Sequence, residues 1–75
     1  MRDRVRAIMA DVFAVDSAQL PDTVTSDDLE QWDSLAHLSL MLELETEFGV
    51  EIASDAMGEL LSLEAIVTYL EAAPA

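Results

Sequence analysis

The fold of this chain depends most on the stretch Gln31-Trp32-Asp33-Ser34-Leu35, which an apolar run ending at Phe48 follows directly. Asp33 is a favourable N-cap, because its carboxylate can accept hydrogen bonds from the free backbone N–H groups of a first helical turn. This cap predicts a central helix over residues 34–47, with the Ser34 hydroxyl projecting from its start. A phosphate ester on Ser34 would lie at the positive end of the helix dipole, where anions are stabilised. We therefore interpret Ser34 as a covalent attachment point.

The central helix is predicted to be apolar on two opposite faces, at 100° per residue. The expected core face holds Ala36, Leu40, Met41, Leu44 and Phe48. The opposite face carries Leu35, Leu38 and Leu42, flanked by Glu45. A helix that is apolar on two sides is either buried on both or offers one side to a partner. Because so short a chain has few elements to cover the second face, we favour partial exposure and docking of a partner protein.

Three more helices follow from apolar periodicity and capping residues. The first covers residues 2–14. A brief one is expected over residues 55–60 or 55–61 after an N-cap at Ser54, and the last begins after an N-cap at Ser62. Gly49 is expected to end the central helix. The inward residues of these three helices are expected to be Val5, Ile8, Met9, Val12, Phe13, Ala56, Met57, Leu60, Leu63, Ile66, Val67 and Leu70.

Residues 15–32 lack helical periodicity and are predicted to form a long loop. We expect it to pack on the core through Val15, Leu20, Val24 and Leu29, since a long unpacked loop is unusual in a compact domain. Thr25 or Ser26 is expected to cap a single helical turn over residues 27–30. The loop is rich in acids but lacks the glycine and the regular ligand spacing of a calcium loop, so we predict no metal site.

Length and composition limit the class of protein. Seventy-five residues predict a single domain over residues 1–75 with one small core and no deep catalytic cleft. There is no cysteine, and hence no disulfide or thiolate nucleophile. No stretch has the pattern of a signal peptide or a membrane span, so we expect a cytoplasmic protein. The net charge of −13 repels nucleic acid, favours basic protein surfaces and is compatible with a monomer.

His37 and the three arginines each have a functional and a purely structural interpretation. His37 follows Ser34 by three residues, which allows a base for a serine hydrolase. We favour a half-buried histidine that is hydrogen-bonded to a loop, because no oxyanion donors or orienting acid are evident. No catalytic residue is predicted. Arg2, Arg4 and Arg6 lie at the end of the first helix that disfavours cations. We favour a solvated face over a functional basic patch there, with the side chains either paired to acids elsewhere or frayed.

Three segments together resemble an acyl carrier protein. They are Trp32-Asp33-Ser34-Leu35, the run Leu44-Glu45-Thr46-Glu47-Phe48-Gly49-Val50-Glu51-Ile52, and the closing Ser62-Leu63-Glu64-Ala65-Ile66-Val67-Thr68-Tyr69-Leu70. The resemblance covers essentially the whole chain. It implies an all-α, four-helix bundle with three long helices, one short helix and a long first loop, and a carrier that is not itself an enzyme.

The resemblance also implies a cofactor and partners. Ser34, between Asp33 and Leu35, matches the serine that receives 4′-phosphopantetheine from coenzyme A through a phosphopantetheinyl transferase. The carrier would hold an acyl group as a thioester on this arm. Leu35, Leu38, Leu42 and Glu45 match the helix that acyl-activating, extending or transferring enzymes grip with basic docking patches.

The sequence differs from the typical fatty-acid carrier at three positions of the central helix. Those carriers typically have acids at the positions of Ala36 and Ser39, and often at that of Thr46. This difference favours a specialised lipid or polyketide pathway. Peptidyl carriers usually have glycines before the serine, unlike Gln31-Trp32, but a stand-alone aminoacyl carrier stays open. An unmodified helical interaction module also stays open, and a serine hydrolase is the least favoured of these functions.

Overall fold

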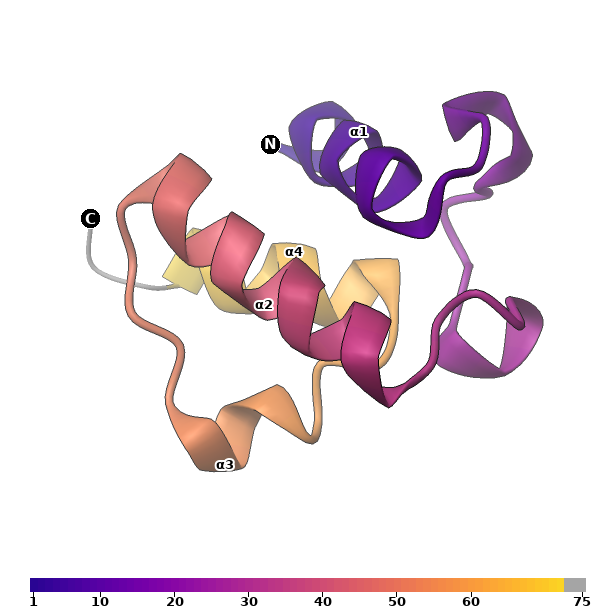
Figure 1. Cartoon of the computed structure of the whole chain (residues 1–75). Coiled ribbons are helices and arrows are strands. Elements are labelled where there is room, and N and C mark those ends of the chain that lie inside the picture. The colour runs from indigo at the N-terminus through magenta and orange to yellow at the C-terminus, as the bar shows by residue number, and fades with distance from the viewer. Residues whose placement is uncertain (73–75) are drawn as a thin grey trace.

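The computed structural model describes residues 1–72 of the chain. Its elements are α1 (Arg2–Phe13), the 3₁₀ turns η1 (Ser17–Gln19) and η2 (Ser26–Asp28), α2 (Ser34–Phe48), α3 (Ser54–Met57) and α4 (Leu63–Ala72). Figure 1 shows α2 across the front of the molecule, with α4 behind it, α1 above it and α3 below it. Within these residues the only β-type pairing is one isolated bridge between Thr25 and Ser62. The predicted all-α fold, with three long helices, one short helix and a long first loop, is confirmed.

The core is apolar and is built by all three long helices, by the long loop and by the links on either side of α3. Its buried residues are Val5, Met9, Phe13, Leu20, Val24, Trp32, Leu40, Met41, Leu44, Ile52, Leu60, Leu63, Ile66, Val67 and Leu70. No polar or charged residue is buried among the described residues. The predicted core face of α2 is confirmed, because Leu40, Met41 and Leu44 are fully buried and its remaining members are half-buried against them.

Both α1 and α2 end in a residue with left-handed backbone conformation. Gly49 has φ 63° and closes α2, as predicted. Ala14 has φ 58° and closes α1, so this helix ends one residue before the predicted boundary. A side chain disfavours this conformation, which glycine adopts freely. The end of α1 is therefore strained where the end of α2 is not.

The long loop contains two short turns where the sequence predicts one. Thr25 caps η2, and the turn expected over residues 27–30 begins one residue earlier and ends two residues earlier, at Ser26–Asp28. The turn η1 is not predicted; its N-cap is Asp16, whose carboxylate accepts from the Ala18 amide. A three-residue 3₁₀ turn is too short to leave a periodic apolar pattern. The loop packs through the four apolar residues predicted, two of them buried and two half-buried.

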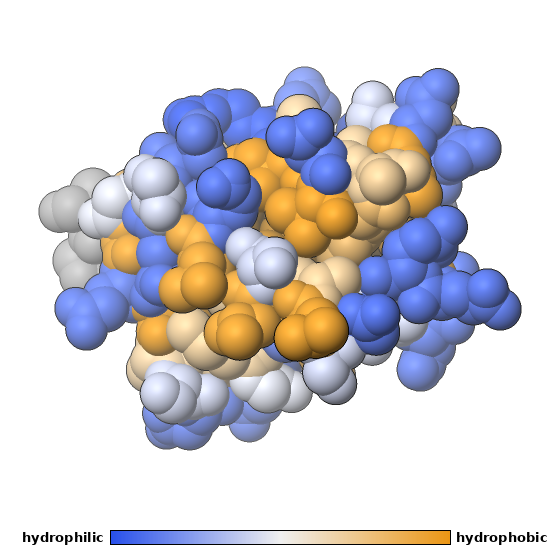
Figure 2. All heavy atoms as spheres, in the orientation of Figure 1, coloured by the Kyte–Doolittle hydropathy of each residue, from blue (hydrophilic) through white to orange (hydrophobic). Residues whose placement is uncertain are grey.

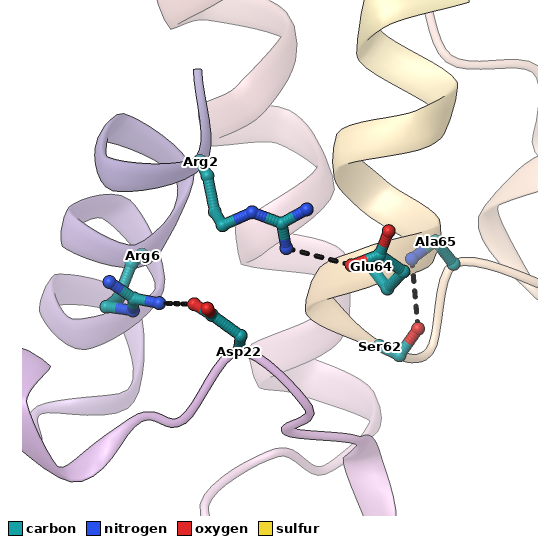
Figure 3. A network of polar contacts seen from close by, with 6 residues as sticks. All are labelled: Arg2, Arg6, Asp22, Ser62, Glu64 and Ala65. Atoms are coloured by element: carbon teal, nitrogen blue, oxygen red, sulfur yellow. Dashed lines mark hydrogen bonds and ion pairs between the residues drawn. The ribbon is translucent and has the colours of Figure 1, made fainter.

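The predictions for α3 and α4 differ in outcome. The predicted extent of α3 and its N-cap at Ser54 are wrong: the helix is the single turn Ser54–Met57, and Ala53 is its N-cap, with no side-chain hydrogen bond. Gly58 follows, and glycine is a poor helix former. The cap of α4 is confirmed, since the Ala65 amide donates to Ser62 Oγ at 3.0 Å (Figure 3).

All three arginines of α1 form ion pairs at the surface, so the pairing that the sequence left open is present, and the Arg4 side chain stays 59% exposed. Arg2 pairs with Glu64 of α4 and Arg6 with Asp22 of the loop (Figure 3). The hydrogen bond to Glu64 raises the pKa of Arg2 above its ordinary value. Arg4 pairs with Glu47 at 3.1 Å, with its guanidinium 4.7 Å from the centre of the Phe48 ring. These pairs join α1 to three different parts of the fold.

Candidate attachment site and docking face

Ser34 is the first residue of α2 and is exposed to solvent. Asp33 is the N-cap, as predicted: its Oδ1 accepts a hydrogen bond from the Ala36 amide at 2.9 Å. The Asp33 carbonyl accepts from the His37 amide at 2.8 Å, which closes the first turn. The serine hydroxyl thus stands at the positive end of a 15-residue helix, on backbone that is fixed by the cap.

A shallow cavity of about 170 Å³ opens beside this serine. It is lined by Ser26, Trp32, Asp33, Ser34, His37 and Leu61. Three parts of the chain meet here: the loop, the first turn of α2 and the link between α3 and α4. The backbone ties two of them together, because the Ser26 amide donates to the Leu61 carbonyl at 2.8 Å and the Leu63 amide donates to the Val24 carbonyl at 3.0 Å.

The second apolar face of α2 is exposed, as the sequence predicts. Leu35, Leu38 and Leu42 are 79%, 50% and 52% exposed. In Figure 2 apolar residues gather across the middle of the view, over α2, and hydrophilic residues surround them. We call these three leucines, together with the exposed Leu61 that lines the cavity beside Ser34, the docking face. Large exposed apolar residues in a group, with a polar surround, are typical of a surface that binds a partner.

Leu61 is the member of the docking face that sequence reasoning misses. It is 42% exposed and lines the same cavity as Ser34, although 27 positions separate them in the chain. The helical pattern made it a possible last residue of α3. The signal lies in the pair Leu60-Leu61 just before the Ser62 cap: neighbouring residues of an extended link point to opposite sides. Leu60 is buried, and Leu61 faces outward.

Glu45, predicted as a docking residue, is half-buried and already has an intramolecular partner. Its Oε2 accepts a hydrogen bond from the Ile52 amide at 2.7 Å. Glu47, two residues further along the helix, pairs with Arg4. Two of the acids of α2 therefore hold the fold together, and the first two turns of the helix carry no acid. A docking role for Glu45 stays a prediction.

His37 is a part-buried residue, and each of its two ring nitrogens has a hydrogen-bond partner. Trp32 Nε1–H donates to His37 Nδ1 at 2.9 Å, and His37 Nε2 lies 2.7 Å from the Met57 carbonyl. Because Nδ1 accepts, Nε2 carries the proton and donates to the carbonyl. Neither nitrogen is left to take a proton from Ser34. The half-buried, hydrogen-bonded histidine is confirmed, and the arrangement contradicts a hydrolase that uses His37 as its base.

A capped helix that presents an exposed serine beside an uncovered leucine face, in a small α-helical fold, suits covalent attachment and partner binding. Comparison with known proteins identifies the class. Residues 3–70 match the family model described as phosphopantetheine attachment site. The chain belongs to this family of phosphopantetheine-binding acyl carriers, whose members bear the phosphopantetheine covalently and are not themselves enzymes.

Similar proteins extend over nearly the full length of the chain. It is 34% identical to the acyl carrier protein of Sinorhizobium fredii over 73 residues, which is 97% of this chain and 94% of the relative. It is 33% identical to the acyl carrier protein of Thermosynechococcus vestitus over 69 residues, 91% and 84% of the two chains. Among solved structures, the holo acyl carrier protein from Geobacter metallireducens matches with a TM-score of 0.82 and 26% identity, covering 93% of this chain and 80% of that one.

Two further findings concern membrane-spanning helices and metal-binding groups in the described residues. Among residues 1–72, none of the helices has the length and apolar character that a lipid bilayer requires of a spanning helix. The same residues contain no group of three or more histidine, aspartate or glutamate side chains arranged to hold a metal ion.

Proposed function

We propose that Ser34 is the residue that receives the 4′-phosphopantetheine arm, transferred from coenzyme A by a phosphopantetheinyl transferase. The observation that carries this proposal is the position of the hydroxyl: exposed, first in α2, and directly after the Asp33 cap. Transfer breaks the serine O–H bond and a pyrophosphate P–O bond of coenzyme A and forms a new serine O–P bond. The proton passes to a base of the transferase, and 3′,5′-adenosine bisphosphate is the leaving group. The new phosphodiester anion lies at the helix N-terminus, which stabilises negative charge.

The docking face supports the second half of the proposal, that enzymes collect and deliver the cargo by binding around α2. Leu35, Leu38 and Leu42 lie along one side of the helix that begins at the attachment residue. A partner that binds these leucines has the arm within reach. Such a face of a few leucines is small, and its contacts are weak enough to release between successive partners. The net charge of −13 favours partners with basic surfaces.

The cargo is proposed to be an acyl group, held as a thioester on the arm, in a specialised lipid or polyketide pathway. Support comes from the surroundings of the docking face, where Ser39 and Thr46 lie at positions at which the fatty-acid carriers it resembles tend to have acids. The proposal includes a monomeric carrier domain that acts in the cytoplasm. A surface this acidic opposes self-association through like-charge repulsion.

Incubation with coenzyme A and a promiscuous phosphopantetheinyl transferase tests the proposal. Intact-mass spectrometry should show one arm added to the wild type and to Ser39→Ala, and none added to Ser34→Ala. Ser39 is a suitable control, because it is an exposed serine on the same helix. An unmodified wild type, or arm addition to Ser34→Ala, would overturn it.

A further inference from the structure

Trp32, His37 and Met57 form a hydrogen-bonded bridge from the long loop, through α2, to α3. The Trp32 indole is buried, 5% exposed, with its ring centre 5.1 Å from that of Phe13 in α1. It donates to His37 Nδ1 at 2.9 Å, and the ring centres of Trp32 and His37 lie 6.1 Å apart. A buried indole N–H needs an acceptor, and the imidazole supplies one only while Nδ1 is unprotonated. The core therefore fixes the orientation of the His37 ring.

At its other end, the bridge binds the C-terminal residue of α3. Met57 is the last residue of this four-residue helix, and its carbonyl lies 2.7 Å from His37 Nε2. The same carbonyl accepts from the Leu60 amide at 3.4 Å, in the turn that leads to Leu61. So short a helix has little stability of its own. His37 thus tethers both the helix and the start of the link that follows it.

The link between α3 and α4 is bound to the long loop near its end, because the Ser26 amide donates to the Leu61 carbonyl at 2.8 Å. Leu61 is consequently fixed from both sides, by η2 and by His37 through Met57. It lies exposed beside the cavity that Ser34 also lines. A docking surface that is already assembled binds more tightly than one that must be ordered on binding, because the ordering cost is not met at association.

We propose that His37 is a positioning residue for partner docking. Acting through Met57, its neutral Nε2–H tautomer holds Leu61 in place beside Ser34 before a partner arrives. This inference rests on the proposed function, since it concerns the face that partners grip. His37 takes no part in arm transfer itself, and its effect falls on the binding of the transferase and not on the chemical step.

Two amide substitutions separate the halves of the bridge. In His37→Asn the Oδ1 atom can occupy the place of Nδ1 and accept from Trp32, while nothing reaches Met57. In His37→Gln the Nε2 amide can occupy the place of the imidazole Nε2 and donate to the Met57 carbonyl, while the indole loses its acceptor. Steady-state kinetics of a phosphopantetheinyl transferase on each unmodified chain give KM and kcat. Amide hydrogen exchange of residues 54–61 reports the tether directly.

We expect His37→Asn to speed amide exchange in residues 54–61. Its KM should rise about two- to tenfold, which corresponds to the loss of one hydrogen bond, and its kcat should be unchanged. His37→Gln should keep the KM and the exchange rates of the wild type, even though the unpartnered indole lowers its melting temperature. A wild-type KM in His37→Asn overturns the proposal. Equal increases in KM in both variants overturn it too, because they would reflect general destabilisation.

The tautomer provides a test that needs no variant. Imidazole ¹⁵N chemical shifts of the unmodified wild type should show a protonated Nε2 and an unprotonated Nδ1. Protonation at Nδ1 would remove the acceptor for Trp32 and overturn the proposal. This measurement and the exchange experiment are independent of arm transfer, so failure of the positioning role is distinguishable from failure of Ser34 as the attachment residue.

Discussion

Asp33 fixes the start of α2 with one carboxylate oxygen, 2.9 Å from the Ala36 amide. This local geometry could be predicted from the sequence, because a cap and the first turn it serves are neighbours in the chain. The same holds for the exposure of Ser34. The partner of His37 Nε2 could not be predicted: Met57 lies 20 residues away, and the fold alone brings its carbonyl to the imidazole.

Removal of the Asp33 cap should destabilise the domain. Asp33→Ala leaves the Ala36 amide without its side-chain acceptor and should lower the free energy of unfolding by about 1 kcal/mol. Asp33→Asn keeps a capping oxygen and should stay within about 0.5 kcal/mol of the wild type. Chemical denaturation followed by circular dichroism measures both. Equal losses in the two variants would show that the carboxylate acts through its charge and not as a cap.

Leu38 and Leu40 offer a matched pair on one helix, 50% and 0% exposed. Leu40→Ala removes core packing and should cost about 2–5 kcal/mol of stability. Leu38→Ala should change stability by no more than about 0.5 kcal/mol, while it raises the KM of the transferase. The pair is compared by thermal melting and by transferase kinetics. A Leu38→Ala variant with unchanged KM would argue against the docking face.

At the scale of elements, the long helices were predictable because their apolar periodicity and caps extend over several turns. The turn α3 is shorter than predicted, since Ala56, Met57 and Leu60 are all spaced for a helix while Gly58 interrupts it. The turn η1 has no counterpart in the sequence pattern, and Leu61 lies in a link rather than in α3. Short elements depend on contacts with the rest of the fold, which local sequence does not encode.

The two left-handed helix ends predict opposite effects of exchanging glycine and alanine. Ala14→Gly relieves the strain at φ 58° and should stabilise the domain, whereas Gly49→Ala introduces the same strain at φ 63° and should destabilise it. No heavy atom outside the neighbouring residues lies within 4 Å of a Cβ built at Gly49, so backbone strain is the only expected cost. Each shift should be about 1 kcal/mol. Differential scanning calorimetry decides, and shifts of the same sign would refute the explanation.

At the scale of the whole molecule, repulsion between carboxylates is the main electrostatic effect on stability. The net charge is −13, and each of the three arginines is already paired with an acid. Exposed ion pairs contribute little, about 0–1 kcal/mol each, so they do not offset the repulsion among the remaining carboxylates. The excess of carboxylates over arginines could be predicted from composition, but the acid that pairs with each arginine could not.

Added salt should therefore raise the melting temperature. Between about 0.01 M and about 1 M sodium chloride the Debye length falls from about 30 Å to about 3 Å, which screens the repulsion. We expect a rise of roughly 4–8 °C for each 1 kcal/mol gained. Magnesium chloride should act in the same direction. A melting temperature that falls with salt would show that the arginine pairs outweigh the repulsion.

The central claim is that Ser34 is the residue on which this carrier bears its arm, and top-down fragmentation of the arm-bearing chain tests it most directly. N-terminal fragments that end before residue 34 should have the unmodified mass, and those that extend past it should carry one arm. C-terminal fragments that begin after residue 34 should carry none. An arm on any fragment that lacks Ser34 would contradict the account.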